Sequence, residues 1–202
     1  MALFVVAIVA LISKRSRVPA AEASSFSFMG SETQTLREQL SLAKGELELA
    51  NAQLNRANQV MHFSTKYKIA ADLAGDVFDI AIQQGIDPDL GFRLVSLESD
   101  FKSGAVSPVG AIGLTQVMPS TAKEMDKNMS RELLFDRRLN LKLGFRYLRG
   151  LITEQKGSVE MALLVYNRGP VAVDKARKAG TDPRNGYERI VMKGYKGKGT
   201  VD

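Results

Sequence analysis

From Lys66 onward, the apolar residues of this chain recur at helical spacing, and residues typical of helix ends stand between the recurrences. One apolar stripe stops at Gly85, a residue favoured just after a helix C-terminus. The following pair, Asp87 and Pro88, is typical of an N-cap and a first helical position. No convincing period-two alternation of a half-buried strand occurs in the sequence. These patterns predict an all-α fold.

The same signals predict five more helices after this one. Pro119 and Pro170 each stand where a first helical residue is expected, and Ser158 suits the N-cap of a helix that ends near Tyr166. Residues 136–154 carry a long apolar stripe, and residues 187–193 form the last expected helix. The predicted fold is therefore a succession of short helices.

A heptad repeat precedes these helices, running from Leu36 to Met61 at alternating spacings of four and three residues. Leucine or methionine occupies the a positions, and alanine occupies three of the four d positions. We expect a coiled-coil-like helix over residues 32–63. The pattern fits a spacer or a self-association handle, and it fits equally a long amphipathic helix that lies along the adjoining domain.

The chain opens with an uncharged apolar run over residues 1–12, followed by Lys14, Arg15 and Arg17. This run is shorter than the roughly 20 residues that span a bilayer, but it has the length of a signal h-region. We expect a signal or anchor segment over residues 1–18, with membrane anchoring through residues 3–12. An apolar N-terminus that docks on the protein itself is the alternative. The small, serine-rich residues 19–31 are interpreted as a linker.

Composition narrows the choice of partners. The net charge of +6 suits any polyanion, whether nucleic acid, anionic lipid or an acidic wall polymer. No zinc-finger or RNP signature and no arginine-rich helix with interleaved aromatics occurs, so no nucleic-acid partner is expected. The absence of cysteine excludes disulfides and thiolate metal sites. No metal and no cofactor is expected, and the Lys- and Gly-rich residues 194–202 are expected to form a basic flexible tail.

Glu98 is the candidate for acid chemistry. It follows an apolar helical run and lies near the end of the helix predicted to begin at Pro88, where the helix dipole raises a carboxyl pKa. The apolar neighbours Leu94 and Val95 act in the same direction by removing water. A carboxylic acid that stays protonated near neutral pH is what cleavage of a glycosidic bond requires. The competing interpretation is a solvated surface glutamate.

A glycine-punctuated loop follows this acid, with Gly104, Gly110 and Gly113 before Gln116. Such a density of glycine suits tight turns and close approach of backbone to a ligand. Gln116 can donate and accept hydrogen bonds at once, as recognition of sugar hydroxyls requires. Met118 offers an adaptable apolar wall, although methionine is by default a core residue.

Three further residues complete the candidate site. Ser99 can hydrogen-bond a substrate or hold the local turn. Tyr166 and Asn167 end a helix just before Gly169 and Pro170, and Asn167 suits helix capping as well as ligand binding. Together with the acid and the loop, these residues indicate a glycosidase-type cleft.

These residues resemble the catalytic domain of the soluble lytic transglycosylases, over residues 67–192. Four motifs in order carry the resemblance: Glu98-Ser99 with Phe101; Ser107, Gly110-Ala111, Gly113-Leu114, Gln116 and Met118-Pro119; Asp136, Asn140, Gly144 and Tyr147-Leu148; and Tyr166-Asn167 with Gly169-Pro170. The resemblance implies a lysozyme-like catalytic domain, which we place at residues 64–193. Val165, Arg168 and the residues before Tyr187 depart from the family pattern, which leaves the details of substrate subsites open.

The resemblance also implies an activity. Members of this family cleave the β-1,4 bond between N-acetylmuramic acid and N-acetylglucosamine in peptidoglycan and leave a 1,6-anhydromuramic end. By this resemblance Glu98 is the sole catalytic acid and then the base, with no second carboxylate required. The residues that correspond to the saccharide site are Ser99, Gln116, Met118, Tyr166, Asn167 and Tyr187.

This resemblance implies peptidoglycan strands as the partner and the cell envelope or periplasm as the location. Two other functions fit the same residues. A goose-type lysozyme has the same fold but uses water, and a non-catalytic peptidoglycan-binding module would use the heptad helix to assemble an envelope complex. The intact Glu98 argues against the second.

Overall fold

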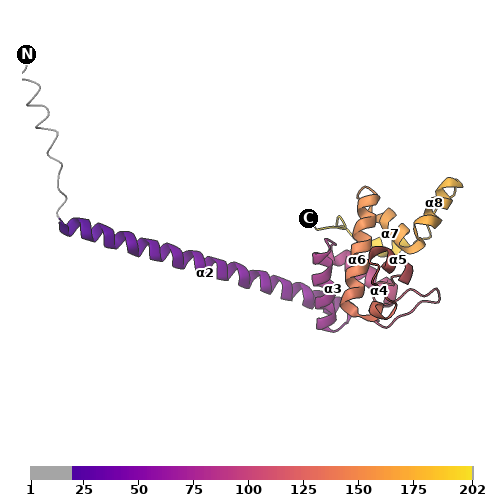
Figure 1. Cartoon of the computed structure of the whole chain (residues 1–202), viewed down its shortest axis with the longest axis horizontal. Coiled ribbons are helices and arrows are strands. Elements are labelled where there is room, and N and C mark those ends of the chain that lie inside the picture. Colours follow the sequence, from indigo (N-terminus) through magenta and orange to yellow (C-terminus); the bar gives the residue numbers. More distant parts are fainter. Residues whose placement is uncertain (1–19, 202) are drawn as a thin grey trace, which may run out of the picture. The chain divides into compact units, whose positions relative to one another are not determined.

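The computed structural model describes residues 20–201, and this part of the chain is helical without a strand (Figure 1). The all-α fold class is confirmed. The apolar segment 1–18, including the predicted anchor, lies outside the described residues. In order, the elements are α2 (Ala20–Tyr67), α3 (Ala71–Gln83), α4 (Pro88–Ser99), α5 (Pro119–Met125), the 3-10 helix η1 (Glu132–Phe135), α6 (Arg137–Glu154), α7 (Val159–Arg168), α8 (Pro170–Lys178) and α9 (Tyr187–Met192).

The chain divides into two compact units, Met1–Arg56 and Ala57–Asp202. In the first, α2 already begins at Ala20, so residues 20–31 are helical where the sequence analysis expects a linker. The reason is local, because alanine stands at three of the first four positions and residues 20–31 contain no proline and, as glycine, only Gly30. Within residues 20–201, no helix has the length and apolar character needed to cross a membrane.

The last turns of α2 belong to the core of the second unit. Val60 and Phe63 are buried, and the Phe63 ring stacks on that of Phe92 in α4 with 4.1 Å between the centroids. Tyr67 lies 5.5 Å from the Phe92 ring and 5.2 Å from the Phe101 ring, measured between centroids. The packed domain therefore includes turns of α2 that precede the predicted boundary at residue 64.

The helix-end signals of the sequence are confirmed. Gly85 adopts a left-handed φ of +69° after α3, and Pro88 is the first residue of α4. The Asp87 carboxylate accepts the backbone N–H of Asp89 at 3.0 Å. The Ser158 hydroxyl accepts the N–H three residues later at 3.3 Å, which caps α7.

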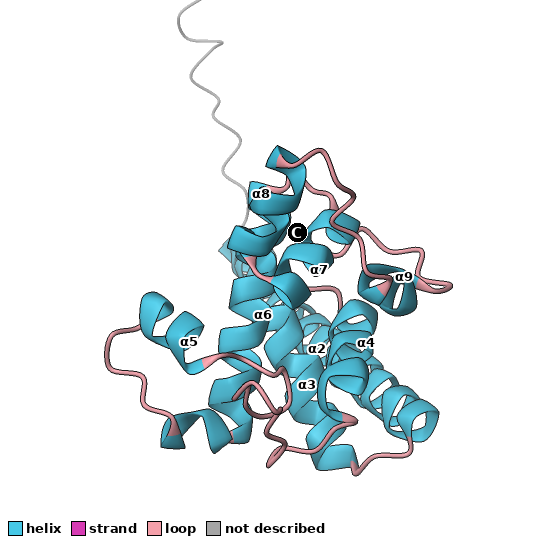
Figure 2. Ribbon diagram, turned by 90° about the vertical axis from the view of Figure 1, so that its right-hand side faces the viewer, coloured by secondary structure: helices cyan, strands magenta, loops and turns pink. Residues whose placement is uncertain are grey.

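Helix α6 lies in the middle of the domain and packs against α3 and α7 (Figure 2). Its buried Asn140, 1% exposed, fastens the loop over residues 102–118. The Asn140 amide donates to the carbonyl oxygens of Ile112 at 2.8 Å and Leu134 at 3.0 Å. Its oxygen accepts the Thr115 N–H at 2.9 Å and the Thr115 hydroxyl at 2.8 Å. An irregular loop is thus held by one side chain of the central helix.

The C-terminal residues are hydrogen-bonded to the domain. Thr200 forms an antiparallel bridge with Ile86, and the backbone N–H of Asp87 donates to the Gly199 carbonyl at 3.0 Å. Gly199 is buried, with a left-handed φ of +86°. The structure of this segment differs from the flexible tail expected over residues 194–202. The expectation rested on the content of lysine and glycine, which does not reveal these specific backbone contacts.

We expect Asn140→Ala to lower the free energy of unfolding by on the order of 3 kcal/mol, because several buried polar groups lose their partners. Urea unfolding followed by circular dichroism measures this change. Asn128→Ala, at an exposed loop position, is the matched control and should stay close to the parent. Equal stability of the two variants would contradict the role given to Asn140.

Candidate active site

A cavity of about 370 Å³ lies beside Glu98, bounded by the 102–118 loop, the start of α5 and the α7–α8 junction. Among the described residues that line it, Glu98 carries the one carboxylate. The lining residues are Glu98, Ser107, Val109, Ala111, Gln116, Val117, Met118, Thr121, Tyr147, Tyr166, Asn167, Arg168, Gly169 and Pro170. The structure thus brings the acid, the loop and the Tyr-Asn pair together at one hollow.

A larger hollow of about 1110 Å³ lies over α9 and the residues before it. Its lining is rich in exposed charged side chains, among them Arg184, which pairs with Glu160 at 3.4 Å. By contrast, burial raises the pKa values of Glu98, Tyr166 and Tyr187, which lie at or next to the smaller cavity. We therefore assign the chemistry to the smaller cavity, because perturbed acids mark functional sites better than volume does.

Glu98 is half-buried in the last turn of α4. Burial raises the pKa of its carboxyl group above the ordinary value, while a hydrogen bond from the Tyr187 hydroxyl to Oε1 partly offsets this increase. The carboxyl also lies at the C-terminal end of the helix, where the dipole disfavours negative charge. The group is therefore suited to carry a proton at a pH where an exposed glutamate has lost it.

Tyr187 is the first residue of α9 and is buried. Burial, together with the neighbouring Glu98 carboxylate, raises the pKa of the Tyr187 hydroxyl well above its ordinary value. The hydroxyl therefore stays protonated and remains a hydrogen-bond donor. Tyr187 is not among the residues that line the cavity, and its contribution to the site is this contact with Glu98.

Tyr166 lines the cavity from α7 and is tied to the core. Its hydroxyl donates to the Thr115 carbonyl at 2.7 Å, and Thr115 is in turn held by Asn140. Burial raises the pKa of Tyr166 well above its ordinary value. Its ring lies 5.4 Å from that of Tyr147, which lines the same cavity from α6. This wall is fixed by packing and by hydrogen bonds together.

Gln116 adopts a left-handed φ of +48° in the loop. Its side-chain nitrogen donates to the carbonyls of Gly113 at 2.9 Å and Ala105 at 3.3 Å. The side-chain oxygen is thus the group that Gln116 can offer to a ligand. Met118 lines the cavity next to it and precedes the first residue of α5.

Asn167 lies exposed at the end of α7 and lines the cavity. Its side-chain oxygen accepts a hydrogen bond from the Asn185 amide at 2.8 Å. The helix itself is capped by Gly169, whose N–H donates to the Val165 carbonyl at 2.8 Å. The capping role that the sequence left open for Asn167 is therefore filled by the glycine.

Ser99, 7% exposed, is absent from the cavity lining. Its hydroxyl oxygen lies 2.8 Å from the Leu114 carbonyl and 3.1 Å from that of Val95. This arrangement ties α4 to the glycine-rich loop. Of the two roles that the sequence left open for Ser99, the structure shows the local structural one.

Sequence reasoning did not assign Thr121, Tyr147 or Arg168 to the site, yet all three line the cavity. Tyr147 lies within the apolar stripe of residues 136–154. The sequence feature that could have indicated its place at the cavity is its hydroxyl group among apolar side chains. Arg168 donates to the Pro183 carbonyl at 2.7 Å. Within residues 20–201, no group of three Asp, Glu, His or Cys side chains is placed to hold a metal ion.

The raised pKa of Glu98 predicts a pH-dependent effect on stability. The folded protein keeps this proton above the ordinary value of 4.5, where the unfolded chain has released it, so stability falls as pH rises through that window. We expect Glu98→Gln to be more stable than the parent at about pH 8, and the difference to vanish near pH 4. Urea unfolding at both pH values, with the exposed Glu124→Gln as control, measures this. A Glu98→Gln protein no more stable than the parent at the higher pH would contradict the burial argument.

Comparisons with known proteins identify the family of this chain. Residues 77–186, more than half of the chain, match the family model described as Transglycosylase SLT domain. Over 87 residues the chain is 36% identical to a protein named Transglycosylase from Enterobacteria phage PRD1, covering 43% of this chain and 31% of that protein. The chain thus spans about a third of the length of this relative.

Two solved structures are also similar. The 70 kDa soluble lytic transglycosylase SLT70 from Escherichia coli matches with a TM-score of 0.50 and 22% identity, over 70% of this chain and 28% of that one. An inactive mutant of the lytic transglycosylase Slt from Pseudomonas aeruginosa matches with a TM-score of 0.43 and 23% identity, over 66% and 22% of the respective chains. The first likeness supports the predicted lysozyme-like fold. On the family-model match, this chain belongs to the transglycosylase SLT domain family.

Proposed function

We propose that this chain is a peptidoglycan lytic transglycosylase in which Glu98 is the one catalytic carboxyl group. The observation that carries the proposal is a half-buried carboxyl with a raised pKa at a cavity whose described lining holds no second acid. Most glycosidases place two carboxylates across the scissile bond. A single acid suffices when the nucleophile is part of the substrate.

The reaction assigned to Glu98 has two proton transfers. Protonated Glu98 first gives its proton to the glycosidic oxygen between N-acetylmuramic acid and N-acetylglucosamine, and the bond from that oxygen to the muramyl C1 breaks. The resulting carboxylate then takes the proton of the muramyl C6 hydroxyl as that oxygen bonds to C1. The enzyme returns to its starting protonation state, and the product carries a 1,6-anhydro ring.

Tyr187 has a defined part in this cycle. Its hydroxyl donates to Glu98 Oε1, and a hydrogen bond to the charged form of an acid stabilises that form. Burial favours the protonated acid before the first transfer, and Tyr187 lowers the cost of the carboxylate after it. The two effects bring the two protonation states closer in energy.

The cavity walls support a saccharide site. The Gln116 side-chain oxygen can accept from sugar hydroxyl or acetamido groups, and Asn167 offers an exposed amide at the rim. The Tyr166 ring and Met118 supply apolar contact surface to a pyranose ring. We assign these four residues to substrate binding, and Ser99 and Tyr187 to support of the loop and of the acid.

The test is turnover of purified peptidoglycan by the full chain and by Glu98→Gln. We expect the variant to lose at least roughly 10³-fold in rate and to keep binding to the glycan, because the amide cannot donate the proton at issue. Mass spectrometry of the released muramic ends identifies the product. Glu124→Gln, which removes an exposed acid, should retain activity.

The outcomes separate the competing functions. Anhydro ends from the parent support the transglycosylase. Reducing ends from the parent would indicate a goose-type lysozyme-like hydrolase, in which water attacks in place of the C6 hydroxyl. A Glu98→Gln variant that still releases muropeptides would remove Glu98 from the mechanism, and a parent that binds but never cleaves would indicate a non-catalytic binding module.

A cell-envelope location follows from the proposed substrate, and within it we propose that two copies of the chain pair through α2. The a positions Leu40, Leu47 and Leu54 are exposed, and the intervening d positions are alanines, which permit close helix approach. In a parallel pair, Glu32 at a g position faces Arg37 at the e position of the partner helix, with complementary charge.

A matched pair of leucines tests this association. Leu47 and Leu49 are 61% and 60% exposed, but Leu47 lies on the proposed seam and Leu49 at a c position outside it. We expect Leu47→Glu to convert the full chain to a monomer in analytical ultracentrifugation, whereas Leu49→Glu should stay dimeric. A monomeric parent, or equal effects of the two variants, would contradict pairing through this seam.

A further inference from the structure

Helices α4 and α9 are connected at two places. Near one end of α9, the Tyr187 hydroxyl donates to Glu98 of α4. At its other end, the guanidinium of Arg93 on α4 donates through Nη1 to the backbone carbonyls of Val191 at 3.2 Å and Lys193 at 2.7 Å. The residue that contacts the end of α9 therefore lies five positions before the acid that contacts its beginning.

Helix α9 depends on such contacts for its placement. It has six residues, too few for a helix to be stable by itself. The last carbonyls of a helix lack partners within the helix, and a positive charge there is favoured by the helix dipole. Arg93 satisfies both requirements, because it supplies donors and charge to the C-terminal end of α9. The position of Tyr187, the first residue of this helix, follows from how α9 is held.

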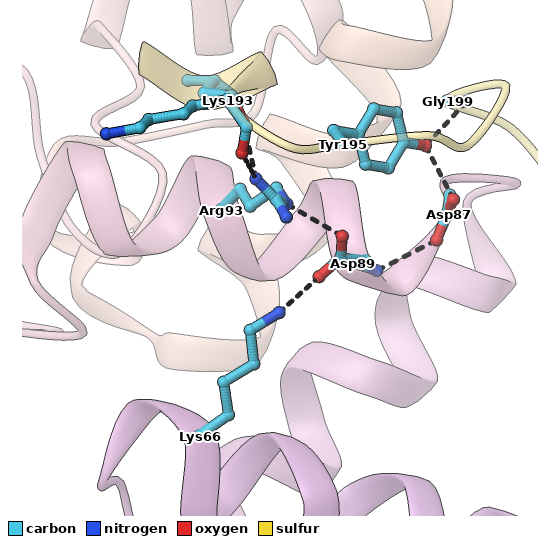
Figure 3. A network of polar contacts seen from close by, with 8 residues as sticks. Lys66, Asp87, Asp89, Arg93, Lys193, Tyr195 and Gly199 are labelled. Carbon is cyan, nitrogen blue, oxygen red and sulfur yellow. Dashed lines mark hydrogen bonds and ion pairs between the residues drawn. The ribbon is translucent and has the colours of Figure 1, made fainter.

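Arg93 is itself held in one orientation. Its Nε donates to the Asp89 carboxylate at 2.8 Å, and the other oxygen of Asp89 accepts from Lys66 Nζ at 2.8 Å (Figure 3). Although burial opposes it, these two hydrogen bonds lower the pKa of Asp89, which keeps the carboxylate charged. The guanidinium is planar, so fixing Nε directs the remaining N–H groups towards α9.

The chain after α9 adds to the same network. The Tyr195 ring centroid lies 5.6 Å from the Arg93 guanidinium carbon. The Tyr195 hydroxyl donates to the Asp87 carboxylate at 2.6 Å and accepts the Gly199 N–H at 2.8 Å, as Figure 3 shows. Residues from the end of α2, the start of α4 and the C-terminal segment thus converge on the arginine that holds α9.

We propose that Arg93 is a positioning residue for the catalytic acid: by fixing the C-terminal end of α9, it keeps the Tyr187 hydroxyl hydrogen-bonded to Glu98. The inference rests on the proposed role of Glu98. The guanidinium touches neither the acid nor the cavity, and its influence passes through the helix.

The consequence is a dependence of the acid on Arg93. The hydrogen bond from Tyr187 lowers the pKa of Glu98, so its loss raises that pKa further. Activity that needs protonated Glu98 then persists to higher pH, so the alkaline limb of the kcat profile shifts to higher pH. Among the described residues that line the cavity with Glu98, the other ionisable ones are Tyr166 on α7, Tyr147 on α6 and Arg168 at the end of α7. Burial raises the pKa of both tyrosines, so the two phenol groups stay protonated across this range.

The experiment compares Arg93→Met, Tyr187→Phe and the double variant in the full chain. We expect Tyr187→Phe to move the alkaline limb of the kcat profile up by roughly half a pH unit or more, and Arg93→Met to move it in the same direction. The double variant should move no further than Tyr187→Phe alone. A shift by Arg93→Met that persists in the Tyr187→Phe background would mean direct charge action on Glu98 and would overturn the proposal.

Two further variants separate positioning from general stability. Arg93→Lys keeps the positive charge but loses the planar guanidinium with its several N–H donors. The alkaline limb of its kcat profile should lie between those of the parent and Arg93→Met. Arg137→Met is the matched control, because it removes an arginine that pairs with Asp72 at 3.0 Å and Asp76 at 2.5 Å on α3. Arg137→Met should lower the free energy of unfolding without shifting the pH profile of kcat. A folded Arg93→Met protein with an unshifted limb would also overturn the proposal.

A measurement without turnover keeps this test apart from that of the proposed function. Carbon-13 NMR of glutamate-labelled protein, with Glu98→Gln to assign the signal, follows the titration of the Glu98 carboxyl directly. We expect Arg93→Met to raise its midpoint whether or not peptidoglycan is cleaved. Inactivity of the parent would defeat the proposed function alone, whereas an unmoved midpoint would defeat the positioning role alone.

Discussion

The contact on which the site depends is the one between the half-buried Glu98 carboxyl and the Tyr187 hydroxyl. Burial disfavours the carboxylate and the tyrosine favours it, so two opposed effects act on one proton. In the catalytic role proposed for Glu98, which gives up a proton and later recovers one, such a balance favours both steps. These two side chains lie 89 residues apart in the sequence, and Arg93 joins the helices that carry them at the other end of α9.

The walls of the cavity are held in a similar way. The 102–118 loop contains turns and isolated backbone bridges but no strand, and Asn140 of the central helix and Ser99 of α4 fasten it to the domain. Thr115, which Asn140 holds, also fixes Tyr166, because its carbonyl accepts the hydrogen bond of the Tyr166 hydroxyl. An irregular loop attached to a rigid helix can present its backbone closely to a ligand and still keep a defined geometry.

Local signals explain what the sequence could predict. The helix ends at Gly85, Asp87 and Ser158 depend on residues within a few positions, and so does the environment of Glu98 at its helix end. Local signals do not place Tyr147 at the cavity, because its position there depends on the packing of α6 against α7. Likewise, the composition of residues 194–202 indicated a flexible tail, because it does not reveal that the Gly199 carbonyl accepts the backbone N–H of the distant Asp87.

The family match ends at residue 186, one position before Tyr187, and begins at residue 77, after the last turn of α2. A fragment trimmed to those limits would therefore keep the acid and the cavity loop yet discard the hydroxyl donor, the lysine that steadies Asp89, and the Phe63 ring beneath Phe92. The compact unit formed by the packed helices is larger than the segment by which its family is recognised, and expression boundaries should be drawn from that unit.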